Sequence, residues 1–184
     1  MGLESTGRRS RYDLSDLGFM DDSRIPEMDM ICDLAARASN SPMSVMVVGD
    51  DVAGRQRLKG VFGIGDSTLK KARIVTGSSL IGRVREATRV VSYTAPPQDG
   101  ISPEDLAVFH AISFLGAPVY GPAGEPIGAV ALYDHMPRTW RSEDYKVVRA
   151  AADLASKQVM MRAALATLKI MAQTSETEIP ILPH

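Results

Sequence analysis

The sequence has little cysteine, no long apolar run and no excess of either charge. Cys32 is the single cysteine among 184 residues, so no disulfide can form within the chain and a disulfide-stapled secreted scaffold is excluded. Lysine and arginine number 21 and aspartate and glutamate 22. The resulting net charge of -1 gives no electrostatic basis for general nucleic-acid binding. No stretch approaches the ~18 apolar residues of a membrane helix, and the N-terminus has no long apolar core, so we expect a cytoplasmic protein that binds neither nucleic acid nor a membrane.

The composition is that of a globular protein with one core. Hydrophobic residues make up 45% of the chain and charged residues 23%, which is too apolar for a disordered chain. We expect a flexible N-terminal segment over residues 1–11 and one domain over residues 12–165. Residues 166–184 are expected to form a helix extension and a disordered tail.

The first third of the sequence predicts two helices and two strands. A short helix that begins at Tyr12 is expected to stop at Gly18. A second, amphipathic helix runs over residues 25–40, with Ser23 as a candidate N-cap. Short β-branched runs over 43–48 and 57–63 predict strands joined as a hairpin. The apolar face of the second helix is expected to comprise Ile25, Met28, Ile31, Leu34, Ala35 and Ala38.

The middle of the chain gives a weaker pattern. Residues 70–76 favour a ragged strand, and Ser78 and Ser79 are suited to cap a short helix that follows them. A strand is expected over 89–93, and a helix with proline in its first turn over 103–112.

The last third predicts a hairpin and a long helix. The runs 114–120 and 127–133 are separated by a turn segment too short for anything but a direct connection. Gly116 and Gly128 lie inside these strands and each predicts a bulge or a close backbone approach. Ser142 is expected to cap the final helix.

Along the final helix, apolar residues alternate at spacings of four and three, which is the pattern of a coiled-coil seam. Its first two turns are expected to pack on the domain's own sheet. The seam is longer than one domain face requires, so we predict parallel or bundled homodimerisation through this helix. The predicted interface residues are Val147, Ala151, Leu154, Gln158, Met161, Leu165, Leu168 and Ala172.

Several segments of the sequence resemble the GAF domain family. Leu17-Gly18-Phe19-Met20-Asp21 is similar to the family's entry segment, and Ile31 to Ala36 with Ser41 to Val45 is similar to its first long helix and opening strand. Phe114 to Val119 with Gly124 to Asp134 is similar to its most recognisable hairpin. Pro137 to Asp144 is similar to the linker into its last helix.

The resemblance covers residues 12–165 and is weakest over 63–100. It implies an α+β fold related to PAS domains, with a central, mainly antiparallel sheet flanked by helices and a long C-terminal helix. It also implies a sensory pocket between the sheet and the middle segment.

The pocket residues carried over from this resemblance combine an apolar lining with a few polar contacts. An apolar concavity of this kind suits a small ligand. The alternative is that the same apolar side chains fill the core. The apolar residues are Phe62, Leu80, Ile81, Val84, Tyr93, Phe114 and Tyr133, and the polar ones are Ser78, Ser79 and Arg83.

The residue types needed for catalysis or metal binding do not occur at suitable spacing. His110, His135 and His184 are far apart, with no cysteine or carboxylate at ligand spacing, so we expect no metal site. No serine stands in a nucleophile elbow. The family includes thiol enzymes that reduce free methionine sulfoxide and domains that attach a tetrapyrrole through cysteine. The former need a second thiol to resolve a sulfenic acid, and Cys32 fits a half-buried, unreactive thiol better.

We therefore expect a regulatory GAF domain rather than an enzyme, with no identifiable cofactor. It would bind a small molecule or a partner protein and signal, through its dimerising C-terminal helix, to another protein in trans. A scaffolding module with a filled pocket is the main alternative, and a small enzyme of the free methionine sulfoxide reductase type is the other.

Overall fold

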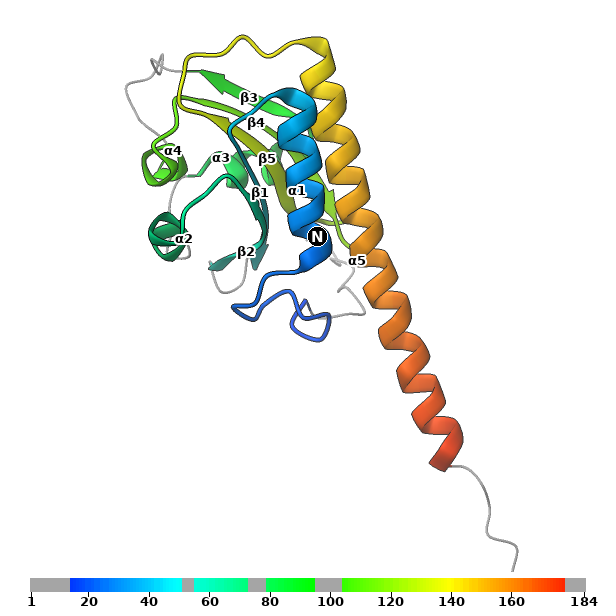
Figure 1. The fold of residues 1–184 in the computed structure, drawn as a ribbon. Coiled ribbons are helices and arrows are strands. Elements are labelled where there is room, and N and C mark those ends of the chain that lie inside the picture. The colour runs from blue at the N-terminus through cyan, green and yellow to red at the C-terminus, as the bar shows by residue number, and fades with distance from the viewer. Residues whose placement is uncertain (1–13, 51–54, 73–78, 95–103, 178–184) are drawn as a thin grey trace, which may run out of the picture.

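The fold is built around a five-stranded antiparallel sheet in the order β2-β1-β5-β4-β3. The structure is a computed structural model, and it describes residues 14–50, 55–72, 79–94 and 104–177. Figure 1 shows the curved sheet with helices on both sides. The strands are β1 (Met43–Asp50), β2 (Arg55–Phe62), β3 (Val91–Thr94), β4 (Ser113–Tyr120) and β5 (Pro126–Asp134).

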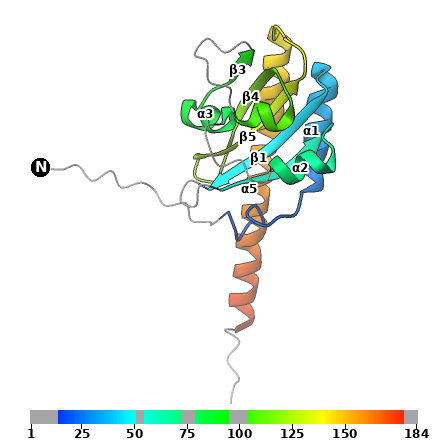
Figure 2. The ribbon, with the colours of Figure 1, turned by 90° about the vertical axis from the view of Figure 1, so that its left-hand side faces the viewer.

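Two long helices cover one face of the sheet, and three short helices lie over the other. The long helices, α1 and α5, lie side by side, and α5 continues well past the body of the domain (Figures 1 and 2). The expected arrangement of an antiparallel sheet flanked by helices is therefore confirmed. The helices are α1 (Pro26–Ser39), α2 (Asp66–Ala72), α3 (Leu80–Ala87), α4 (Glu104–Phe109) and α5 (Ser142–Thr177).

The strands are apolar on both faces because both faces are covered. In β1, Met46 and Val48 face the long helices, while Val45 and Val47 face the short ones. This two-residue alternation divides the core into two clusters. Because every buried strand carries large apolar side chains on each side, a one-residue slip in register would exchange the two cores.

Three helix starts show which capping predictions hold. Ser79 is the N-cap of α3, and its hydroxyl accepts a hydrogen bond from the Gly82 N–H at 3.0 Å, as predicted. Ser23 does not cap α1. Ile25 holds that position without a side-chain cap, and the Ser23 hydroxyl donates to Asp21 instead. Helix α5 includes Ser142 as its first residue, so its start is stabilised by other groups, described below.

Other local predictions need correction. Residues 14–18 form turns rather than a helix, although the chain reverses at Gly18 with a φ of 74°. Residues 70–72 belong to α2, not to a strand; the rest of that predicted strand lies outside the described residues. On α1, Leu34 is 60% exposed instead of contributing to the core.

Close packing explains why glycine occupies two positions inside the hairpin strands. A Cβ at Gly128 would lie 2.0 Å from the Val47 carbonyl oxygen, and a Cβ at Gly116 would lie 2.5 Å from the Phe114 ring. Neither strand could accept a side chain there without moving. The prediction of close backbone approach is confirmed at Gly128, whereas the close neighbours of Gly116 are the side chains of Phe114 and Val84.

A bulge in β2 holds the segment that leads into α1. Between Met46 and Val47 the register of β1 against β2 shifts, so Lys59 has no partner across the ladder. The Lys59 carbonyl accepts a hydrogen bond from Ile25 N–H at 2.8 Å. Its side chain is fully buried, and Nζ donates to Asp21 Oδ1 at 2.6 Å and to the carbonyls of Asp21 and Ser23. These bonds fix residues 21–25 against the sheet edge.

Candidate functional site

The face under the short helices contains a compact aromatic cluster. Phe109 of α4, Phe114 of β4 and Tyr133 of β5 are all buried. The Tyr133 ring centroid lies 4.7 Å from that of Phe109 and 5.2 Å from that of Phe114, with tilted and edge-to-face geometry. Such pairs add about 0.5–1.5 kcal/mol each beyond the burial of their area. The cluster therefore forms a rigid floor on this side of the sheet.

Most of the predicted pocket residues meet at this floor. Leu80, Ile81 and Val84 of α3 are buried in the same core cluster as Phe114 and Tyr133, and Tyr93 of β3 packs against its edge. The structure thus brings six of the predicted side chains together.

The remaining four predicted pocket residues behave differently. Phe62 is misplaced by the prediction, because it faces α1 on the opposite side of the sheet, where the Arg37 guanidinium lies 5.3 Å from its ring centroid. Arg83 is exposed. The Ser79 hydroxyl is engaged by the α3 N-terminus and by Gln56 Nε2 at 3.1 Å. Ser78 lies outside the described residues.

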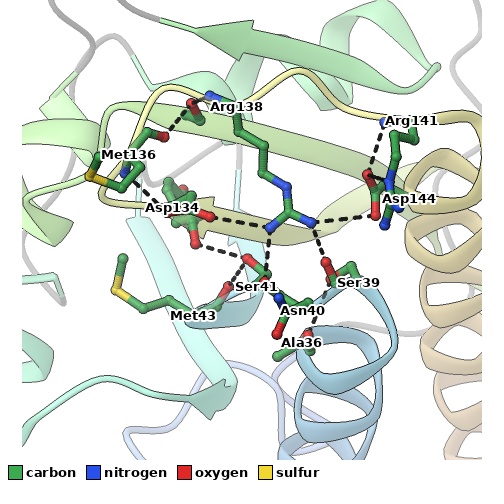
Figure 3. Close-up of polar contacts among 12 residues, drawn as sticks. Ala36, Ser39, Asn40, Ser41, Met43, Asp134, Met136, Arg138, Arg141 and Asp144 are labelled. Atoms are coloured by element: carbon green, nitrogen blue, oxygen red, sulfur yellow. Dashed lines mark hydrogen bonds and ion pairs between the residues drawn. The ribbon is translucent and has the colours of Figure 1, made fainter.

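A polar network joins this floor to the long helices. Arg138, in the segment between β5 and α5, donates from Nη1 to Asp134 Oδ2 at 3.2 Å and to the Asn40 carbonyl at 3.0 Å (Figure 3). Its Nη2 donates to the Ser39 carbonyl and lies 3.5 Å from Asp144 Oδ1. Asp134 directly follows Tyr133, so one guanidinium contacts the end of β5, the end of α1 and the start of α5.

This network satisfies groups that helix ends leave unpaired. The carbonyls of Ser39 and Asn40 belong to the C-terminus of α1, where cations and donors are favoured. At the start of α5, Asp144 accepts the Arg141 N–H at 2.9 Å, and its side chain is 2% exposed. The Arg138 guanidinium also lies 4.5 Å from the centroid of the Trp140 ring. Arg138 is therefore held from several sides.

Sequence reasoning missed Arg138. Asp134 and Arg138 stand four residues apart, but the segment is not helical, so helical pair rules do not predict the contact. The carbonyls that Arg138 binds lie about a hundred residues earlier and carry no sequence signal. Only the resemblance of residues 137–144 to a family linker pointed to this segment.

The predicted dimer seam is divided between buried and exposed residues. Ala151 is buried and Val147 is partly buried against the domain's own core. By contrast, Leu154, Met161, Leu165 and Leu168 are 46–61% exposed. The domain's own core thus covers the start of the seam, at Val147 and Ala151, and leaves most of the later apolar seam residues exposed.

Helix α1 contributes to the same exposed surface. An apolar groove of about 190 Å³ runs between α1 and α5. Met30 of α1, which precedes the groove residue Ile31, is also 65% exposed. We call this surface the α1/α5 face. The groove is lined by Ile31, Leu34, Ala35, Ala38, Val147, Ala150, Ala151 and Leu154.

The one cysteine is remote from any reactive surface. Cys32 on α1 is fully buried, which makes it more enclosed than the half-buried thiol expected from sequence. Burial raises the pKa of its thiol from 9.0 to about 12. At neutral pH the sulfur is therefore protonated and non-nucleophilic. Within the described part of the chain no three histidine, cysteine or acidic side chains are grouped to hold a metal.

Comparison with known proteins identifies the family. The GAF domain model matches residues 28–159, which is more than half of the chain and includes the sheet, α1 and the first half of α5. The chain belongs to the GAF domain family. This family is typical of sensory and regulatory domains in signalling proteins. No curated protein matches this GAF domain by sequence.

Solved structures show the same fold at low identity. The GAF domain of a phosphoenolpyruvate-protein phosphotransferase from Coxiella burnetii is 22% identical, with a TM-score of 0.60 over 83% of this chain and 96% of that one. A GAF domain/HD domain protein from Geobacter sulfurreducens is 15% identical, with a TM-score of 0.61 over 83% and 99%. A type II free methionine-R-sulfoxide reductase from Thermoplasma acidophilum is 18% identical, with a TM-score of 0.57 over 72% and 89%. The fold therefore occurs with both regulatory and enzymatic functions.

Among the described residues, no helix has both the length and the apolar content needed to cross a membrane.

Proposed function

We propose that this GAF domain is a non-enzymatic regulatory module. In this proposal, it forms a homodimer through the α1/α5 face and passes a signal from the aromatic floor to α5. A small molecule or a partner protein engages the aromatic side of the sheet. The orientation of the long helix in the dimer is the output that a further protein reads.

The observation that carries the proposal is the exposed apolar surface of α5 beyond the domain body. Among the residues of α5 whose burial the structure describes, Ala163 is the last that is buried. After it, Leu165, Leu168, Ile170 and Met171 are 53–61% exposed on a helix that extends away from the rest of the molecule (Figures 1 and 2). A lone helical segment of this length is only marginally stable in water. A second copy would stabilise it by covering the seam side chains among them, Leu165 and Leu168.

The groove between α1 and α5 supports a broader contact than a two-stranded coil. It continues the apolar surface of the distal helix onto the domain body, and its lining is almost entirely apolar. We therefore place α1, through Leu34, in the proposed interface beside α5. The interface predicted from sequence used α5 alone and included Ala151, which the domain's own core already covers.

The Arg138 network supports a route between the two sides of the sheet. A shift of β5 at Tyr133 moves Asp134, which shares the Arg138 guanidinium with the end of α1 and with Asp144 of α5. Both helices of the proposed interface are thus bonded to the strand that carries the aromatic floor. The mechanism would be a shift in population between two packings of α5.

The state of Cys32 supports a non-enzymatic role. A thiol enzyme of the methionine sulfoxide reductase type needs an accessible thiolate, and a second thiol to resolve the sulfenic acid. The chain has one cysteine, which is buried and has a raised pKa. Scaffolding without a ligand remains the alternative that the ligand test below separates from sensing.

The dimer is tested by light scattering of the purified full chain. We expect Leu165→Glu to halve the molecular mass, because it places a charge in the centre of the apolar surface. Thr174→Glu is the matched control: it adds the same charge to the same exposed stretch of α5, on the opposite side of the helix, and should leave the dimer intact. A wild-type monomer, or an L165E variant that stays dimeric, would refute the proposed interface.

Ligand binding is tested separately by native mass spectrometry of protein purified from its source. A copurified small molecule that is lost in Tyr133→Ala supports sensing. Wild-type protein that carries no adduct, together with amide shifts at β5 on addition of a partner protein, would favour scaffolding.

A further inference from the structure

A second hollow lies on the helix side of the sheet, on the other side of α5 from the α1/α5 groove. It has a volume of about 310 Å³, near the lower limit of about 300 Å³ for small-molecule sites. Three segments surround it: the turn between α3 and β3, the outer half of β4, and one turn of α5. The lining consists of Thr88, Arg89, Val90, Ala117, Pro118, Tyr120, Arg149, Ala152 and Asp153.

The hollow forms because β4 extends beyond the end of its neighbour β3. The ladder between them ends at Val91 opposite Gly116, while β4 continues to Tyr120. Pro118 follows in β4, and proline is tolerated in a strand where its missing N–H faces an open edge. The chain at residues 88–90 diverges from β4 there, and α5 covers the gap from the helix side.

The walls of the hollow are fixed by hydrogen bonds. The Tyr120 hydroxyl donates to the Thr88 carbonyl at 3.2 Å, which joins β4 to the turn after α3. The Tyr120 N–H donates to Ser156 Oγ at 2.9 Å, and that hydroxyl donates to the Ala152 carbonyl of α5 at 2.8 Å. These bonds fix the three segments around the hollow relative to one another.

The backbone of Thr88 is a further indication that the surrounding contacts fix the shape of the hollow. Its φ is 51°, in the left-handed region, which is rare for a β-branched residue. Its N–H donates to the Arg85 carbonyl, and its own carbonyl accepts the Tyr120 hydroxyl. Strained backbone of this kind persists where the surroundings fix it, and it occurs often at binding sites.

The charges of the hollow define the ligand. Arg89 and Arg149 line it from opposite segments, and neither guanidinium has a hydrogen-bond or ion-pair partner among the residues that the structure describes. Asp153 adds one carboxylate, so the lining carries a net charge of about +1, the sum of two arginines and one aspartate. Guanidinium groups bind carboxylate and phosphate oxygens in bidentate geometry. The floor, with Ala117, Ala152 and Val90, is apolar.

We propose that this hollow is a binding site for a small oxyanion metabolite, with its carboxylate or phosphate on Arg89 and Arg149. A hydrogen-bond donor elsewhere on the ligand meets Asp153. The site lies on the opposite side of the sheet from the aromatic floor and goes beyond the proposed function. Because α5 forms one wall, occupancy would also tie that helix to β4.

The test is a titration of the uniformly labelled full chain, followed by amide chemical shifts at constant ionic strength. Inorganic phosphate and succinate are the two probes, and they distinguish a phosphate from a carboxylate ligand. We expect saturable shifts at residues 88–90, 117–120 and 149–153 with at least one of them. In the double variant Arg89→Gln/Arg149→Gln, the affinity should fall at least tenfold.

Arg83→Gln is the matched control, because Arg83 is exposed on α3 and does not line the hollow. It should bind the probes as the wild type does. Shifts that do not saturate, shifts confined to other segments, or equal affinity in the double variant would overturn the proposal. Since both arginines are exposed, the double variant should keep the wild-type spectrum elsewhere, which verifies that it is folded. The result is independent of the Leu165→Glu mass measurement, so the failure of either proposal leaves the other standing.

Discussion

On one face the sheet is covered by the two long helices α1 and α5, whereas the other face is covered by three short helices and a cluster of aromatic rings. The part of α5 that crosses the sheet buries small side chains, among them Ala152, Ala155 and Ala163. The opposite face instead buries Phe109, Phe114 and Tyr133. Small residues let a long helix lie close to the strands along many turns, while large rings fill the space under short helices.

The two sides of the sheet therefore differ in how they are packed. The helix side is a continuous, regular contact that keeps α5 straight and directs it out of the domain. The aromatic side depends on a few large contacts, which join α4, β4 and β5. Arg138 lies where β5 leaves one side and α5 begins on the other, and it is bonded to both.

The largest effect is expected from removing a ring on the aromatic side. Phe114→Ala should lower the free energy of unfolding by about 3–5 kcal/mol, because the buried ring leaves a cavity beside Tyr133. Urea unfolding of the full chain measures the change. A loss below about 1 kcal/mol would mean that this side is loosely packed and that the contrast between the faces is wrong.

A smaller loss is expected from enlarging a residue on the helix side. Ala155→Leu should cost about 1–3 kcal/mol, because Ala155 is fully buried between α5 and the sheet and leaves no room for three more carbons. The same urea measurement applies, with the exposed Ala164→Leu on α5 as control. If A155L were neutral, close helix approach would not be what the alanines provide.

The smallest effect, and the one with a pH signature, concerns the segment that precedes α1. The hydrogen bond from Lys59 lowers the pKa of Asp21 from 3.8 to about 2. A depressed folded-state pKa stabilises the fold above the unfolded pKa, and this stabilisation disappears as the pH falls from about 4 to about 2. Asp21→Asn should therefore lower the urea midpoint at pH 6 and converge on the wild type toward pH 2–3. Asp16→Asn, which carries no such contact to Lys59, is the control. A difference between D21N and wild type that stays constant with pH would contradict the assignment.

Local sequence was sufficient where neighbours in the chain are also neighbours in the fold. The β4–β5 hairpin, the helix at 26–39 and the Ser79 cap all depend on residues a few positions apart, and all were predicted. The prediction for residues 70–72 failed because their apolar and basic mixture has no clear period. Leu34 was misassigned because helical spacing identifies an apolar face of α1. It does not show how much of that face α5 and the sheet cover.

The candidate sites divide in the same way. The resemblance to the family correctly predicted that Leu80, Val84, Phe114 and Tyr133 lie on one side of the sheet. It wrongly grouped Phe62 with them. Strand alternation beyond the β2 bulge sends that side chain to the other face. The Arg138 network and the oxyanion site were not predicted, since each joins segments whose contact depends on strand order.

The sequence by itself determined the family, the two-sided apolar pattern of the strands and the long apolar seam of α5. These follow from hydrophobic period and from turn and cap chemistry, which act over a few residues. The tertiary structure alone decided which part of the seam is already buried, which buried cation fixes the entry to α1, and which two arginines line one hollow beside β4. Those outcomes depend on packing between distant segments, where burial and geometry, rather than spacing along the chain, set the free energy.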